Sequence, residues 1–133
     1  MIAGLDDRQI KYLSNTHEGK KHDKKICDEE KITVPAGSHL YRDSGFQGHE
    51  LPAVTIYQPK KKPRGEELTW VDKVQNRLLA QVRVGVEHII ASVKRCRIVK
   101  EVFRNTRDGY EDLVMELACG LHNFRSEQRL LCY

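Results

Sequence analysis

Apolar residues recur at helical spacing through the second half of the chain. The stripe consists of Leu79, Val82, Val86, Ile89 and Val93, which step by three and four residues. This period predicts one apolar face on a long basic helix over about residues 70–104. Thr69 is a suitable N-cap for that helix, and Asp72 stands three residues further on, in the position of a weak capping box. Gly85 lies inside the pattern and marks a point where the helix can break or bend.

A second helical pattern occupies the last part of the sequence. A turn over residues 105–109 precedes it, and Asp108 is a candidate cap. The helix itself is predicted over residues 110–127. Its apolar stripe consists of Leu113, Leu117, Leu121 and Phe124. We interpret these four side chains as core.

The first half of the chain predicts short strands. Residues 9–16, 38–42 and 53–57 read as strands, while residues 22–31 fit a short helix. Residues 58–67 (QPKKKPRGEE) place two prolines and a glycine around a basic run. This composition predicts a flexible basic loop that leads into the long helix.

The length and composition fit one small, highly charged domain. The 133 residues are enough for a single core, so we predict one domain over residues 1–133. Apolar residues make up 39% and charged residues 32%, which indicates a small core under a charged surface. The apolar stretches are too short for a membrane span, and the first residues lack the pattern of a secretory signal. Four scattered cysteines are typical of reduced thiols, so we expect a cytoplasmic protein with no membrane partner.

Positive charge is concentrated in one segment. The chain carries 23 basic and 19 acidic residues, a net charge of +4. Residues 60–104 hold twelve of the basic residues and five of the acidic ones, so this segment is +7 and the remainder is −3. Such asymmetry favours a polyanionic partner. A solvated helix face explains the same pattern equally well.

Two acidic residues are candidate ligands of a divalent cation. Asp43 follows the strand SHLYR, and Glu87 lies beside the stripe of the long helix, with Arg83 four residues before it and Lys94 seven after it. Taken alone, Glu87 is more simply a surface ion pair. Hard carboxylate oxygens suit Mg²⁺ or Mn²⁺, and such ions activate a water or a 3′-hydroxyl for displacement at phosphorus. Together, Asp43 and Glu87 suggest a phosphoryl-transfer site.

Five segments carry a resemblance to a known family. They are YLSNTHEGKKHDKKICDEE (12–30), YRDSGFQG (41–48), YQPKKKPRGEEL (57–68), NRLLAQVRVGVEHIIASVKRCRIVKEVFRN (76–105) and DLVMELACGLHNFR (112–125). The ordered set Gly-x-x-His-Asp, Asp-x-Gly-Phe-x-Gly and Arg-x-x-Val-Glu-His is specific. The chain resembles the C-terminal half of bacterial insertion-sequence transposases of the DDE superfamily endonuclease type.

The resemblance implies a fold, a reaction and catalytic residues. The fold would be an incomplete ribonuclease-H-like α/β/α fold, and the reaction would be Mg²⁺-dependent nicking of DNA and strand transfer in transposition. The family triad is two aspartates and one glutamate, of which Asp43 matches the second aspartate and Glu87 the glutamate. His22 and Asp23 match a secondary His-Asp pair that we expect to order a loop near the site.

The expected DNA contacts are basic residues around these acids. They are Lys20, Lys21, Lys60, Lys61, Lys62, Arg64, Arg83, Lys94, Arg95 and Arg97. Each would contact a phosphate of the transposon ends or the target DNA. The protein would then act at the bacterial nucleoid.

The sequence departs from the family at the first catalytic aspartate. In the family this residue lies on a strand upstream of the segment where this chain begins. Asp6 and Asp7 precede the 9–16 strand where the family has a hairpin turn, so we do not assign them the role. We therefore expect a fragment that is inactive without an N-terminal transposase half and that dimerises when complete. The alternatives are a non-enzymatic DNA-binding or regulatory fragment and a decayed transposase relic.

Overall fold

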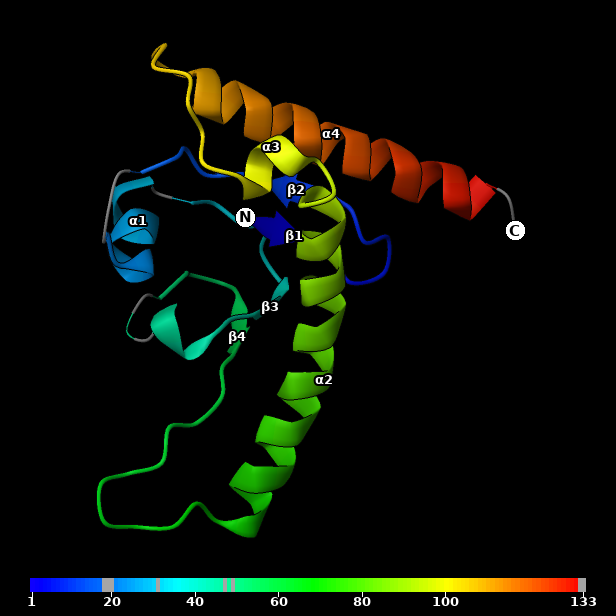
Figure 1. Ribbon diagram of the computed structural model, residues 1–133. Helices are drawn as coiled ribbons and strands as arrows, with labels where there is room; N and C mark the ends of the chain where they lie inside the picture. Colours follow the sequence, from blue (N-terminus) through cyan, green and yellow to red (C-terminus); the bar gives the residue numbers. More distant parts are fainter. Residues whose placement is uncertain (18–20, 31, 47, 49, 132–133) are drawn as a thin grey trace. The chain divides into compact units, whose positions relative to one another are not determined.

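The computed structural model of the chain describes residues 1–17, 21–30, 32–46, 48 and 50–131, with the side chains of residues 23 and 130 left undescribed. The chain forms two compact units (Figure 1). One unit combines Met1–Thr16 with Arg83–Tyr133, and the other is His17–Val82. Each unit mixes short strands with helices, which confirms the predicted α/β class and is compatible with a DDE nuclease domain.

The first unit begins with a small antiparallel hairpin. Strand β1 (Ile2–Ala3) pairs with β2 (Ile10–Tyr12), so the strand predicted over residues 9–16 is present but short. The Gly4 N–H donates to the Gln9 carbonyl across the turn, at 2.8 Å. Asp7 accepts the Gln9 N–H at 3.0 Å and forms an ion pair with Lys11. Asp7 therefore has a local role in the turn.

Two polar side chains fasten helix α4 (Tyr110–Leu131) to the hairpin. Asn123 accepts the Ile10 N–H at 2.7 Å and donates its amide to the Ile10 carbonyl at 2.9 Å. The neighbouring His122 is buried, and its Nε2 donates to the Arg8 carbonyl at 2.8 Å. These bonds fix which face of α4 lies against β2.

The core of this unit is small and uses an unexpected face of α4. Its buried apolar residues are Ile10, Ile89, Val93, Ala118 and Cys119. The predicted core stripe of α4, Leu113, Leu117, Leu121 and Phe124, is wrong, because those side chains are between 45% and 60% exposed. The small side chains of Ala118 and Cys119 allow a close approach to the hairpin, and His122 and Asn123 bond to its backbone. The leucines consequently point away.

The long helix is shorter than its predicted span. Helix α2 (Trp70–Val93) passes through Gly85 without a break, and the predicted stripe on it is at least half-buried throughout. It ends at Val93, and a turn leads to the short helix α3 (Arg97–Lys100). The prediction of one helix to residue 104 is wrong, because the positions that would extend the stripe are Arg97, Lys100 and Arg104. After the turn, Val99 packs against the core instead.

The start of α4 agrees with the sequence pattern. The turn over residues 105–109 is present, and Gly109 adopts φ +71° just before the helix. That left-handed conformation favours glycine. Asn105, rather than Asp108, supplies a side-chain bond in this turn by accepting the Arg107 N–H at 3.1 Å. The helix extends to Leu131, beyond the predicted residue 127.

The second unit contains a parallel strand pair. Strand β3 (His39–Tyr41) pairs in register with β4 (Thr55–Tyr57), and a 3₁₀ turn, η1 (Ser44–Phe46), lies in the connection. Helix α1 (Asp23–Glu30) contacts η1. The strands predicted over residues 38–42 and 53–57 are thus confirmed with shorter bounds. None of the helices in the described ranges has an apolar stretch able to span a membrane.

The basic loop is tied to the first turns of α2. Asp72 donates its N–H to the Thr69 hydroxyl at 3.2 Å, and its carboxylate accepts from that hydroxyl at 2.7 Å, which confirms the predicted cap. Lys60 donates its ammonium to Asp72 at 2.9 Å. The Lys60 backbone also exchanges two hydrogen bonds with the Asn76 side chain, at 2.9 and 3.0 Å. The hydroxyl of Thr69 and the ammonium of Lys60 lower the pKa of Asp72.

Replacing Asn123 by alanine is expected to destabilise the first unit. The Asn123→Ala variant leaves the N–H and C=O of Ile10 without their partner, which typically costs about 1–3 kcal/mol. Chemical denaturation followed by circular dichroism measures the loss. Gln128→Ala, an exposed change on the same helix, is the control. Equal stability of the two variants would contradict the assigned role of Asn123.

The Asp72 cap predicts a pH-dependent stability. Because the folded-state pKa of Asp72 is lowered, its stabilisation is present above the unfolded-state pKa and is lost as the pH falls through the folded value. We expect Asp72→Asn to have a lower Tm than the parent at pH 7 and the two Tm values to converge below about pH 4. Asp108→Asn serves as the control. A Tm difference that stays constant down to acid pH would argue against the cap.

Candidate functional site

Asp43 follows strand β3, as predicted, and lies at the carboxyl end of the parallel strand pair. The Arg42 N–H donates to the Tyr57 carbonyl at 3.0 Å and extends the pairing by one step beyond Tyr41. The exposed Asp43 carboxylate then accepts the Ser44 N–H at 2.7 Å. Its carbonyl accepts from the Phe46 N–H at 3.2 Å and from the Gln58 amide at 3.4 Å. Hydrogen bonds from its own turn and from Gln58, the residue after β4, thus orient Asp43.

Glu87 stands on the exposed flank of α2. Its carboxylate lies 3.4 Å from the Arg83 Nε, and both side chains are 62% exposed. An ion pair this exposed is weak and is screened by salt. Glu87 belongs to the first unit and Asp43 to the second. Their convergence on shared cations stays a prediction.

The carboxylates of this chain fit the donor chemistry of a hard cation. Exposed carboxylate oxygens suit Mg²⁺ or Mn²⁺ rather than a soft metal. Within the described ranges, no three side chains of His, Cys, Asp or Glu gather in a metal-binding group.

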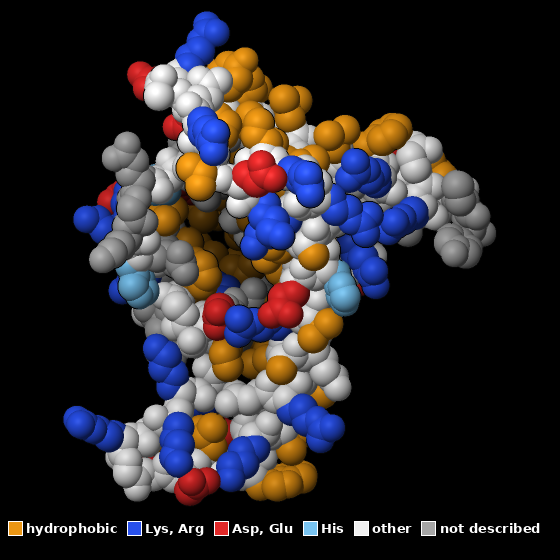
Figure 2. Space-filling view, in the orientation of Figure 1, with side chains coloured by type: hydrophobic (Ala, Val, Ile, Leu, Met, Phe, Trp, Pro, Cys, Tyr) orange, Lys and Arg blue, Asp and Glu red, His pale blue; other side chains and the backbone are white. Residues whose placement is uncertain are grey.

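The predicted DNA contacts divide into two groups. Lys20 lies outside the described residues, and four others have acidic partners: Lys21 pairs with Glu29, Lys60 with Asp72, Lys62 with Glu67 and Arg83 with Glu87. The remaining five are exposed and make no ion pair with any residue that the structure describes. They are Lys61, Arg64, Lys94, Arg95 and Arg97. Figure 2 shows basic side chains gathered over the end of α2 that leads into α3.

His22 directly precedes helix α1 and caps its first turn. Its Nδ1 accepts the Lys24 N–H at 3.3 Å, and its carbonyl accepts the N–H groups of Lys25 and Ile26 at 2.9 and 3.2 Å. Asp23 is the first residue of the helix. Since α1 contacts the η1 turn that follows Asp43, this cap is compatible with an ordering role near the acid. The role of the His22–Asp23 pair stays a prediction.

An aromatic stack beside Asp43 was not anticipated. The rings of Tyr41 and Tyr57 are stacked, with centroids 4.8 Å apart and planes 15° apart. The Tyr57 hydroxyl is 3.2 Å from the His39 Nδ1, and both tyrosines are exposed. The signal was present in the strands HLY and TIY, because a parallel register places their third residues side by side. The stack flanks the strand end that carries Asp43.

The sequence of this chain is similar to those of known proteins. The family described as DDE superfamily endonuclease matches residues 1–123. A probable transposase for insertion sequence element IS702 from Microchaete diplosiphon is 28% identical over 107 residues. That alignment covers 80% of this chain and 38% of the relative's length. No solved structure gives a significant match. With the family match extending over most of its length, the chain belongs to the DDE superfamily endonucleases.

Proposed function

We propose that this chain forms the C-terminal portion of a transposase catalytic domain with a ribonuclease-H-like fold. Its reaction is the Mg²⁺- or Mn²⁺-dependent nicking of DNA and strand transfer at the ends of an insertion sequence. The observation that carries this proposal is the position of Asp43, at the carboxyl end of a parallel strand pair, in a chain that the endonuclease family matches over residues 1–123. In open α/β sheets this edge is where ligands bind.

In the proposed mechanism the two acids bind the divalent cations, and nearby basic residues bind the DNA. Divalent cations supply activation of the attacking oxygen and stabilisation of the leaving oxygen in phosphoryl transfer. In this proposal Asp43 and Glu87 are their ligands, and the Ser44 N–H that donates to Asp43 orients one of the ligand oxygens. Arg83, beside Glu87, offsets the repulsion between that carboxylate and a DNA phosphate. The five basic residues that make no ion pair within the described part of the chain contact the backbone further along the DNA.

The proposed reaction needs a part of a transposase that this chain does not supply. Only two of the three family carboxylates have candidates here, and the chain covers 38% of its relative's length. We infer that an N-terminal transposase portion provides the first aspartate, and that the complete enzyme acts as a dimer on paired ends in the nucleoid. Alone, the chain is expected to bind the cation weakly and to leave DNA uncut.

Mn²⁺ binding tests the proposal on the chain itself. Paramagnetic Mn²⁺ is expected to broaden the amide signals next to Asp43 and next to Glu87 over the same range of Mn²⁺ concentration, because the two carboxylates share the ions. Asp43→Asn or Glu87→Gln should each remove both sets of effects. Changing a residue that merely supports a metal ligand costs about 10–100-fold in affinity, so loss of a ligand should cost more than about 100-fold.

The matched controls are Asp108→Asn and Glu101→Gln, which make the same changes at exposed acids elsewhere. Both should leave the Mn²⁺ effects intact. If Mn²⁺ broadened the signals around one acid without the other, or if the controls weakened binding as much as the site variants, the shared site would be wrong.

A second candidate function is DNA binding without cleavage. The observation that favours it is the group of five exposed basic residues without an ion-pair partner in the described part of the chain, next to an incomplete set of carboxylates. Such a protein would regulate transposition by occupying transposon ends. It would bind DNA with a steep salt dependence and would never cut, even when joined to the rest of a transposase.

Both functions predict that the loop contacts DNA through Lys61 and Arg64 rather than Lys60. Lys60 is held by Asp72 and Asn76, whereas Lys61 and Arg64 are exposed. The Lys61→Ala, Arg64→Ala double variant should reduce the slope of log K against log salt by about 1.8, roughly 0.9 for each lost phosphate contact. Fluorescence anisotropy with labelled duplex DNA measures it. An unchanged slope, or an equal reduction in a Lys25→Ala, Arg104→Ala control, would remove the loop from the DNA interface.

A further inference from the structure

The first turn of α2 exposes the only tryptophan of the chain. Trp70 is the first residue of this helix, and it is 77% exposed. The neighbouring Val71 is 57% exposed, so the exposed apolar surface extends beyond a single residue. An indole is large and mostly apolar, and burying it stabilises a fold more than burying most other side chains. Its exposure at a helix end therefore indicates an interaction surface rather than a core position.

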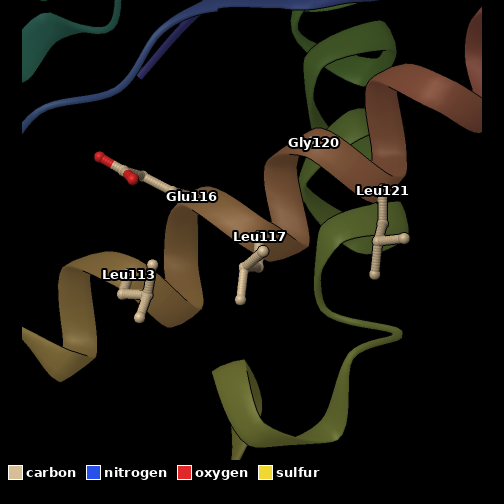
Figure 3. A pocket seen from close by; sticks show the side chains of 5 residues that line it. All are labelled: Leu113, Glu116, Leu117, Gly120 and Leu121. Atoms are coloured by element: carbon tan, nitrogen blue, oxygen red, sulfur yellow. The ribbon is translucent and has the colours of Figure 1, made fainter.

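The exposed apolar surface of α4 differs in kind from this one. Figure 3 shows Leu113, Leu117 and Leu121 projecting on one side of that helix, with Glu116 directed elsewhere. These residues and Gly120 line a shallow hollow. Aliphatic side chains have no π face on which a base can stack, and the described residues around the hollow include an acid and no cation. The surface of α4 therefore does not fit a nucleic acid, whereas an indole beside cations does.

Cations lie on the same face of α2 as the indole. Residues three, four and seven positions apart are neighbours along one face of a helix, so Lys73 and Arg77 follow Trp70 on its own side. Both basic residues are exposed. Lys73 forms an ion pair with Glu67 at 3.1 Å, whereas Arg77 makes no ion pair with any residue in the described part of the chain. Arg77 is therefore available to a phosphate close to the indole.

The basic loop is held at the start of α2. The backbone of Lys60 exchanges two hydrogen bonds with the Asn76 side chain, and its ammonium donates to Asp72. These bonds keep the next residue, Lys61, near the first turns of the helix, and both Lys61 and Arg64 are exposed. Figure 2 shows basic and hydrophobic side chains next to one another at the lower end of the view, where the loop leads into α2. All of these residues belong to the second unit.

The helix cap fixes the backbone that carries the indole. The Thr69 hydroxyl accepts the Asp72 N–H at 3.2 Å and donates to the Asp72 carboxylate at 2.7 Å. Trp70 lies between these two residues, so its backbone is ordered before any ligand binds. A tryptophan has only two side-chain torsions, and a pre-ordered one loses little conformational freedom on binding. The start of α2 is thus a suitable support for a stacking contact.

We propose that Trp70 stacks on an unpaired base of a DNA strand whose phosphates contact Arg77 and the basic loop. Every base has a flat π face, so such stacking tolerates any sequence. Inside a duplex, neighbouring base pairs cover these faces. The ligand is therefore a nucleotide of single-stranded DNA or one turned out of a duplex. The inference rests on the proposed function and deepens it, because it names the form of DNA that this part of the chain binds.

Tryptophan fluorescence of the full chain tests the stacking directly. Because the chain contains one tryptophan, the emission reports on Trp70 alone. Single-stranded oligothymidine is expected to quench it strongly, whereas a fully paired duplex of the same length should leave it nearly unchanged. Unchanged emission after addition of excess oligothymidine, or equal quenching by the duplex, would overturn the proposal.

A duplex that carries an extra unpaired thymine distinguishes the two sources of an unpaired base. Quenching by this bulged duplex, as strong as that by oligothymidine, would identify a nucleotide turned out of a duplex as the ligand. Quenching by oligothymidine alone would identify single-stranded DNA. Either result supports stacking on an unpaired base.

Substitutions separate stacking from general burial of apolar surface. Trp70→Ala should weaken binding of oligothymidine by about 5- to 150-fold and leave binding of the duplex unchanged. Trp70→Phe keeps a π face and should retain most of the affinity. The control is Leu78→Ala, which removes another exposed apolar side chain from α2 and should have no effect. Fluorescence anisotropy with labelled oligonucleotides measures each affinity. A Trp70→Phe variant as weak as Trp70→Ala, or an equal loss in the control, would contradict stacking.

Acrylamide accessibility separates a DNA ligand from a protein contact. Acrylamide is expected to quench Trp70 freely in the chain alone and much less once oligothymidine is bound. Protection of the indole without DNA would assign it to a contact with protein and would overturn the proposal. None of these measurements involves a divalent cation. Failure of Trp70 to stack would leave the cation site of Asp43 and Glu87 standing, and a chain that stacks on DNA without binding Mn²⁺ would refute only that site.

Discussion

Two hydrogen bonds between the Asn123 side chain and the backbone of Ile10 determine which face of α4 packs against the hairpin in the first unit. They pair both polar groups of a buried strand residue with one side chain of α4, at 2.7 and 2.9 Å. Leaving a buried N–H and C=O without partners typically costs about 1–3 kcal/mol, so these bonds favour the face of α4 that carries Asn123. The bonds therefore set the rotation of α4, and the leucine stripe faces outward as a consequence.

Local patterns were enough to predict much of the structure around the candidate site. The N-cap at Thr69, the stripe of α2 and the strand that delivers Asp43 each depend on residues close together in the chain. The turn before α4 is another such case, because Gly109 alone supplies its left-handed conformation. Short-range hydrogen bonds and residue propensities dominate at these points, so the sequence contained the information needed.

Contacts between distant segments account for what the sequence did not predict. Periodicity marked the leucines of α4 as core, because leucine is usually buried, whereas the bonds of His122 and Asn123 join residues more than one hundred positions apart. The end of α2 at Val93 likewise depends on Val99 reaching the core after the turn. The Tyr41–Tyr57 stack required the register of two strands. In each case a tertiary contact overrode the local pattern.

The smallness of the core connects the stability of this chain to its partners. No described side chain is less than 2% exposed, and five apolar residues make up the buried cluster. Burying one leucine side chain contributes about 1.5–3 kcal/mol. Covering the exposed apolar side chains of α4 would therefore add substantially to the stability that the small core provides. A partner that binds the folded state through this stripe stabilises it by mass action. Binding of a partner to this stripe would therefore support folding of the unit that carries Glu87, one of the two proposed cation ligands.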